Sequence, residues 1–124
     1  MANISIIGAG SWGTALAVLL GNNGHVVTIW SALEKELQML ETERELKSLP
    51  GVRILDNTIV TGSLQEAMEK KDVLALAVAS SYTRETARRM AEYLKPGQII
   101  VNVAKGIEDN TLLTLSQVIE EELL

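Results

Sequence analysis

NISIIGAGSWGTALA, residues 3–17, places an apolar strand, a G-x-G-x-x-G turn and the small-residue start of a helix in one unbroken run. Gly8 permits a tight turn off the strand, and Gly10 lets the backbone approach a pyrophosphate with no side chain in the way. Gly13 lets the helix pack closely on the sheet, and the helix N-terminus offers free N–H groups and a positive dipole end to phosphates. The stretch therefore predicts a dinucleotide-binding turn.

Composition limits the number of domains and the kinds of partner and site that the chain can have. The chain has 124 residues, 47% of them hydrophobic, which suits one compact domain. Its net charge is −5 and no basic cluster is longer than Arg88-Arg89, so we expect no nucleic-acid partner. No apolar run approaches the length of a membrane span, and the N-terminus enters a strand directly rather than a signal peptide, so no membrane insertion is expected. Cysteine is absent and His25 is the only histidine, so we predict no metal site, and a cytoplasmic location fits.

Short apolar runs alternate with longer amphipathic ones, a pattern typical of βαβ units. The predicted strands are 4–7, 26–30, 58–61, 73–78 and 99–103. The predicted helices are 12–22, 33–46, 64–70, 82–94 and 111–122. The strands 4–7, 73–78 and 99–103 are mostly apolar, as expected where helices cover both faces. We predict an α/β fold of the Rossmann type: a single domain in three layers around a doubly wound parallel sheet of order 3-2-1-4-5.

This order gathers the carboxyl ends of three strands around one crevice, where open α/β sheets bind their ligands. The residues that follow those strands are 8–13, 79–81 and 104–106. Lys105 is the cation of this set: it could contact a cofactor, hold an anionic substrate or polarise a carbonyl, or it could be an ordinary solvated loop lysine. Trp12 could flank the cofactor or cover a neighbouring apolar patch.

The end of the second predicted strand bears on the choice of cofactor. NAD-binding domains usually carry an acid about 20 residues beyond the glycine motif, but Trp30-Ser31-Ala32 stands there. A neutral Ser31 does not repel a 2′-phosphate and could hydrogen-bond it, so the sequence favours NADPH over NADH. The nearby glutamates are interpreted as a solvated acidic helix face: Glu34, Glu36, Glu41, Glu43 and Glu45.

The stretch GAGSWGTALA (8–17) resembles the N-terminal signature of the bacterial NAD(P)-dependent glycerol-3-phosphate dehydrogenase family. The same order and spacing are found for NGH (23–25), LPG (49–51), AVAS (77–80), VNVAKGIE (101–108) and LSQVIEEE (115–122). Two positions depart from the family pattern: Ala79 stands where proline is common, and Ala32 where many members have arginine.

The resemblance implies a reversible hydride transfer between a nicotinamide and C2 of glycerol 3-phosphate or dihydroxyacetone phosphate, which supplies the phospholipid backbone precursor. Ser11 and Trp12 would contact NAD(P)H, with the backbone of Ala79 facing it, and Lys105 would lie where cofactor and phosphorylated substrate meet. The cofactor-binding set is thus Gly8, Gly10, Ser11, Trp12, Gly13, Ser31, Ala79 and Lys105, with Lys105 also binding substrate.

The family's general acid/base lysine belongs to a helical C-terminal domain absent from residues 1–124, so the resemblance places no catalytic residue in this chain and predicts no activity for it alone. Homodimer formation would depend on that domain. Two rival interpretations remain open: a dehydrogenase of the 6-phosphogluconate dehydrogenase type, which the AKGIE motif (104–108) disfavours, and a noncatalytic nucleotide-sensing module, which leaves Lys105 without a role.

Overall fold

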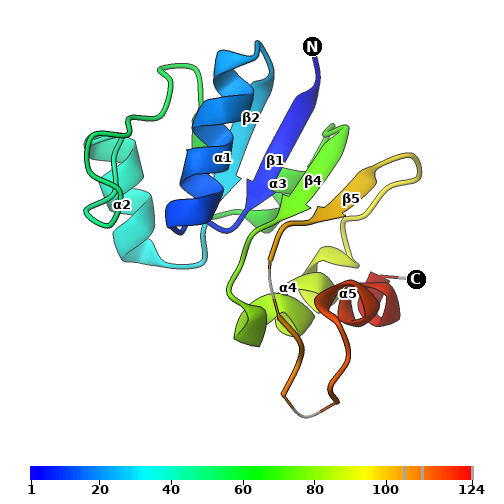
Figure 1. Cartoon of the computed structure of the whole chain (residues 1–124). Helices are drawn as coiled ribbons and strands as arrows, with labels where there is room; N and C mark the ends of the chain where they lie inside the picture. The colour runs from blue at the N-terminus through cyan, green and yellow to red at the C-terminus, as the bar shows by residue number, and fades with distance from the viewer. Residues whose placement is uncertain (105, 110, 124) are drawn as a thin grey trace.

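The computed structural model describes residues 1–104, 106–109 and 111–123. Within these ranges strands and helices alternate along the chain (Figure 1). In chain order they are β1 (Asn3–Ile7), α1 (Ser11–Asn22), β2 (Val26–Trp30), α2 (Glu34–Thr42), β3 (Ile59–Thr61), α3 (Leu64–Met68), β4 (Val73–Leu76), the 3-10 helix η1 (Ser80–Tyr82), α4 (Thr83–Met90), β5 (Ile99–Asn102) and α5 (Leu115–Leu123).

The five strands form one parallel sheet of order β3-β2-β1-β4-β5, which confirms the predicted topology. β1 is central: Ile7 lies opposite Trp30 of β2 and Leu76 of β4. Because the strands are parallel and in this register, the turn after β1 and the loops after β2 and β4 meet at the same edge of the sheet.

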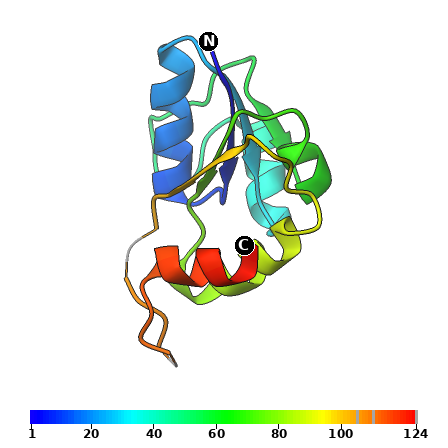
Figure 2. The same ribbon diagram turned by 90° about the vertical axis from the view of Figure 1, so that its right-hand side faces the viewer.

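Helices cover the sheet in two layers (Figure 2). On one face, Ala17 of α1 and Leu40 of α2 pack with Ile6 and Ile29. On the other face, α3, α4 and α5 enclose a second core that includes Ile7, Trp30 and Leu76. Alternate strand residues thus point into different cores, as a sheet buried on both sides requires.

The edge strand β5 departs from the expectation of burial on both faces. Ile100 packs against the second core, but Ile99 and Val101 on the opposite face are 59% and 40% exposed. The reason is the placement of α1, which lies over β1 and β2 and leaves the β5 end of that face uncovered (Figure 1).

Helix α2 is shorter than predicted, ending at Thr42 instead of residue 46. Arg44 adopts a left-handed backbone conformation (φ 60°) that ends the helix, and its guanidinium donates to the carbonyl oxygen of Thr58 at 2.8 Å. Leu46 still reaches the first core, but from the loop. Apolar periodicity alone therefore extended the predicted helix too far.

Helix α5 begins later than predicted, at Leu115 rather than residue 111. Thr114 and Gln117 form a reciprocal cap: Gln117 N–H donates to Thr114 Oγ1 and Thr114 N–H donates to Gln117 Oε1. Helix α4 begins one residue late because η1 precedes it, and it ends at Met90 rather than 94. Strand β4 ends at Leu76, two residues early, although Ala77 N–H still donates to the carbonyl oxygen of Ile7 at 2.9 Å.

Candidate functional site: two cavities beside a glycine turn

The turn after β1 is closely packed at Gly8. Its N–H donates to the carbonyl oxygen of Trp30 at 2.9 Å, and its φ of +125° is a conformation that favours glycine. A Cβ at Gly8 would lie 2.7 Å from the carbonyl carbon of Ala77. A Cβ at Gly13 would collide with the carbonyl oxygen of Gly8. The fold itself therefore requires both glycines.

Gly10 is different, because the surrounding protein does not require it. It caps the N-terminus of α1 with an extended backbone (φ −68°, ψ −177°), and an added Cβ would meet no atom of the described residues within 4 Å. The first turn of α1 contains no acidic residue, and none of the side chains that the structure describes caps its N-terminus. An open surface over uncapped N–H groups at the positive end of a helix dipole fits a pyrophosphate.

Ser11, the first residue of α1, lies beside Ser48, a residue that the sequence analysis did not predict to be near the site. Its Oγ lies 2.7 Å from Ser48 Oγ, in the loop between α2 and β3. Two exposed hydroxyls thus stand together at the helix N-terminus, where either can donate to an anion.

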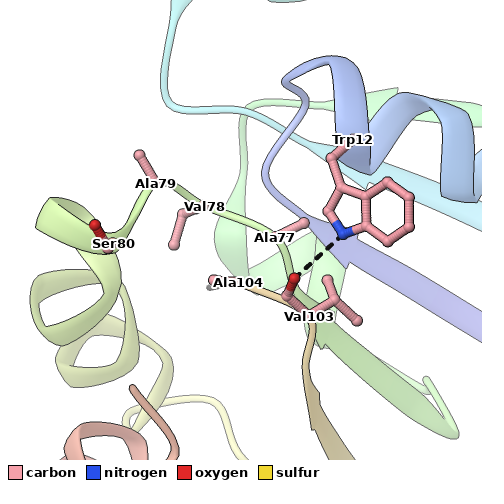
Figure 3. Close-up of a pocket in the computed structure, with 7 residues that line it drawn as sticks. All are labelled: Trp12, Ala77, Val78, Ala79, Ser80, Val103 and Ala104. Carbon is pink, nitrogen blue, oxygen red and sulfur yellow. Dashed lines mark hydrogen bonds between the residues drawn. The ribbon is translucent and has the colours of Figure 1, made fainter. Parts of the chain in front are cut away.

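A backbone ridge formed by Ala77, Val78 and Ala79 separates two cavities, and all three residues line both. The first cavity, of about 430 Å³, is completed by Trp12, Ser80, Val103 and Ala104 (Figure 3). The second, of about 290 Å³, lies on the β2 side. Among the residues that line the second cavity are Gly8, Gly10, Ser31, Glu36, Tyr82, Glu85 and Arg89.

Trp12 faces the first cavity while remaining 58% exposed. Its indole Nε1–H donates to the carbonyl oxygen of Val103 at 3.2 Å, the contact drawn in Figure 3. This hydrogen bond fixes the ring at the carboxyl end of β5, so Trp12 forms one wall of the cavity with its surface still accessible to a ligand.

Ser31 lies at the second cavity, but its hydroxyl is already engaged. The side chain is 2% exposed; Oγ accepts from Leu33 N–H at 3.0 Å and lies 2.7 Å from Glu36 Oε1, to which it donates. The interpretation of Glu36 as part of a solvated acidic face is therefore wrong, since this half-buried carboxylate turns back to the end of β2. The position of Glu36, three residues into α2, is the signal that could have shown this, because acids there commonly reach back across the helix start.

Lys105 lies outside the described residues. Ala104, which precedes it in the chain, lines the first cavity, and Ala104 N–H donates to Asn102 Oδ1 at 3.0 Å.

An ion-pair network holds the segment that follows β5. Arg84 of α4 donates to both carboxylate oxygens of Glu108, at 2.7 and 2.9 Å, and to Glu122 of α5 at 2.7 Å. The Arg84 guanidinium lowers the pKa of Glu108 to about 2 and also lowers that of Glu122. No pattern in the sequence indicates this network, because Arg84 is 24 residues from Glu108 and 38 from Glu122.

Comparison with known proteins shows what this arrangement is similar to. Residues 3–124 match the family described as the NAD-dependent glycerol-3-phosphate dehydrogenase N-terminus. A curated relative from Agathobacter rectalis, glycerol-3-phosphate dehydrogenase [NAD(P)+], is 52% identical over 99% of this chain and 37% of its own length. Another from Lactobacillus delbrueckii subsp. bulgaricus is 50% identical, over 99% of this chain and 36% of its own length. The chain thus spans little more than a third of the length of these relatives.

A solved structure supports the same relationship. The glycerol-3-phosphate dehydrogenase of Coxiella burnetii superposes with a TM-score of 0.90 at 27% identity, over 98% of this chain and 38% of that one. A UDP-glucose dehydrogenase from Pyrobaculum islandicum superposes with a TM-score of 0.79 over 99% of this chain and 33% of that one; at 21% identity it shows a shared fold only. None of the described helices is long and apolar enough to cross a bilayer.

Proposed function

Since the chain belongs to the family of NAD-dependent glycerol-3-phosphate dehydrogenase N-termini, we propose that residues 1–124 are the cofactor-binding unit of an oxidoreductase that interconverts dihydroxyacetone phosphate and sn-glycerol 3-phosphate with NAD(P)H. Family membership favours this function over a 6-phosphogluconate dehydrogenase-type enzyme and over a nucleotide-sensing module. In the cell the reaction would supply the glycerophospholipid precursor, in the cytoplasm.

The observation that carries the proposal is the open surface at Gly10. Packing accounts for Gly8 and Gly13, whereas an added Cβ at Gly10 would contact no described residue. A bound pyrophosphate accounts for a glycine there, since a side chain would stand between it and the N–H groups of α1. Gly8, Gly10, Ser11 and Gly13 would form the turn that holds the pyrophosphate, and Trp12 would contact the cofactor in the first cavity.

The two cavities suit the two ends of a dinucleotide. The backbone ridge that includes Ala79 runs between them, and the glycine turn lines the second. We assign the adenosine end to the second cavity, at the end of β2, and the nicotinamide end to the first, beside Trp12 and Ala104. A cofactor bound there would supply or accept the hydride, and Trp12 with the ridge would shield its nicotinamide end from water.

The other half of the chemistry belongs to the part of the relatives that this chain does not span. We propose that Lys105 binds the phosphorylated substrate beside the nicotinamide, and that a lysine beyond residue 124 acts as general acid/base. The 124-residue chain alone would then bind cofactor without turnover, because it would not hold the cofactor and the substrate next to each other. Homodimer formation by the full-length protein is part of the same proposal.

The preference for NADPH that the sequence predicts depends on a neutral group at the end of β2. In the structure the neutral Ser31 hydroxyl is bonded to the Glu36 carboxylate, so the charge at that position is negative. The reason for preferring NADPH therefore does not hold.

Calorimetric titration of NADH and NADPH into the folded chain tests the proposal. Gly10→Val should weaken binding at least tenfold without changing the far-UV circular dichroism spectrum, because an added Cβ at residue 10 lies in open space over the N-terminus of α1, where the pyrophosphate would bind. Ala91→Val, which enlarges an exposed residue just beyond α4, is the matched control and should bind as the native chain does. Unchanged affinity in Gly10→Val, or no binding by the native chain, would refute the proposal.

A further inference from the structure

The carboxylate of Glu36 occupies the end of β2, although the residue belongs to α2. Its Oε1 lies 2.7 Å from Ser31 Oγ, and Ser31 directly follows the last residue of the strand. NAD-binding domains commonly place an acid at this point to bind the adenosine ribose. Here the acid comes from five residues further along the chain.

The local structure fixes the direction of this carboxylate. The N–H of Ser31 donates to the carbonyl oxygen of Thr61 of β3 at 3.3 Å, which ties the residue to the sheet edge. The Ser31 hydroxyl accepts from Leu33 N–H and donates to Glu36, so it connects the strand end, the helix start and the acid. Glu36 is thus oriented before any ligand binds.

The carboxylate also shares a cavity with the glycine turn. Glu36, Ser31, Gly8 and Gly10 all line the second cavity. A dinucleotide whose pyrophosphate lies over Gly10 and whose adenosine enters this cavity brings its ribose toward Glu36. The other charged residues that line the cavity, Glu85 and Arg89, belong to α4.

We propose that Glu36 makes this site select NADH over NADPH, by accepting hydrogen bonds from the 2′- and 3′-hydroxyls of the adenosine ribose and repelling a 2′-phosphate. The proposal rests on the proposed cofactor-binding function. A ribose hydroxyl is a donor, and its hydrogen bond to a carboxylate is charge-assisted. The 2′-phosphate carries up to two negative charges and no donor when fully ionised, so the same contact becomes repulsive.

Arg89 is the residue lining this cavity whose positive charge could favour NADPH over NADH. Its guanidinium lies 5.5 Å from the centroid of the Trp30 ring, on the α4 side of the cavity. An arginine stacked on an aromatic ring can also stack on an adenine, and we assign it that role because the strand end already presents a carboxylate. If Arg89 held a 2′-phosphate instead, its removal would weaken NADPH more than NADH.

The test measures dissociation constants of NADH and NADPH for the native chain, Glu36→Gln and Glu34→Gln. Coulomb repulsion of a phosphate a few ångströms from a carboxylate predicts that the native chain prefers NADH by about tenfold or more. Glu36→Gln keeps an acceptor for Ser31 but removes the charge, so the preference should fall by about tenfold. Glu34→Gln removes a charge from the exposed side of the same helix and should leave the ratio within about twofold.

Three results would overturn the inference while leaving the proposed function standing. They are a preference of the native chain for NADPH, a ratio of NADPH to NADH dissociation constants that does not change in Glu36→Gln, and a change of that ratio in Glu34→Gln as large as in Glu36→Gln. A selective loss of NADPH affinity in Arg89→Gln would also overturn it. Failure of the native, folded chain to bind either cofactor would refute the proposed function, and the inference with it. Circular dichroism of each variant separates these outcomes from misfolding.

Discussion

Replacing Gly8 by alanine should destabilise the fold far more than the same change at Gly10. The backbone of Gly8 has φ +125°, and holding an L-residue in such a region costs about 1–3 kcal/mol. The new Cβ would also lie 2.7 Å from both the carbonyl carbon of Ala77 and the nitrogen of Val78. Relieving that overlap means moving the end of β4, and overpacking of this kind costs about 1–3 kcal/mol.

The two costs together predict a loss of about 2–6 kcal/mol in the free energy of unfolding for Gly8→Ala, against a total of about 5–15 kcal/mol for a typical domain. At Gly10 the backbone already suits an L-residue and the space is open. The loss of a favourable N-cap residue is offset by a less flexible unfolded chain, so Gly10→Ala should change stability by no more than about 1 kcal/mol.

Urea unfolding followed by tryptophan fluorescence measures both changes, because Trp30 is buried in the second core and becomes exposed on unfolding. The midpoint of Gly8→Ala should shift clearly to lower urea and that of Gly10→Ala should stay near the native value. Similar midpoints for the two variants would refute the claim that packing requires Gly8 and only a ligand requires Gly10.

Three further predictions concern the core, the ion-pair network and the reaction. Thr28 Oγ1 is buried with no hydrogen-bond partner among the described residues, so Thr28→Val should leave urea stability unchanged or raise it by about 1 kcal/mol; a clear loss would show a hidden partner. The folded-state pKa of Glu108, about 2, lies below its ordinary 4.5, so its pairing with Arg84 stabilises the fold above pH 4.5 and is lost as the pH falls toward 2. Glu108→Gln should therefore lower the melting temperature at pH 7, and the difference in melting temperature from the native chain should disappear at acid pH. A difference in melting temperature that does not change with pH would contradict this. In the full-length protein, Lys105→Ala should reduce turnover of dihydroxyacetone phosphate far more than NADH affinity, and equal losses would favour a nucleotide-sensing module.

The glycine turn could be predicted because residues 3–17 contain strand, turn and helix start together. The sheet order could be predicted because alternating apolar and amphipathic runs indicate βαβ units, and the doubly wound arrangement of such units with right-handed crossovers has this order. Helix ends were less predictable. The end of α2 depends on the left-handed backbone at Arg44, and the start of α5 on the Thr114–Gln117 cap, which apolar periodicity does not reveal.

The second cavity shows why site residues are harder to derive than folds. Glu36 looks like one glutamate among several on a helix, and only the turn from Ser31 to Leu33 brings it back to β2. Ser48 approaches Ser11 from 37 residues away, and Arg84 meets Glu108 across 24. The last two contacts depend on how loops and helices are placed in three dimensions, which no local pattern specifies.

A two-dimensional ¹H–¹⁵N NMR titration of the chain with NADH tests the central claim most directly, because it locates the ligand residue by residue. The account predicts that the largest shift changes occur at the amides of Gly10, Ser11 and Gly13, at the Trp12 indole N–H and along the ridge 77–79 between the two cavities. Changes confined to the opposite edge of the sheet, around Lys71 and Lys95, or no changes at saturating NADH, would contradict it.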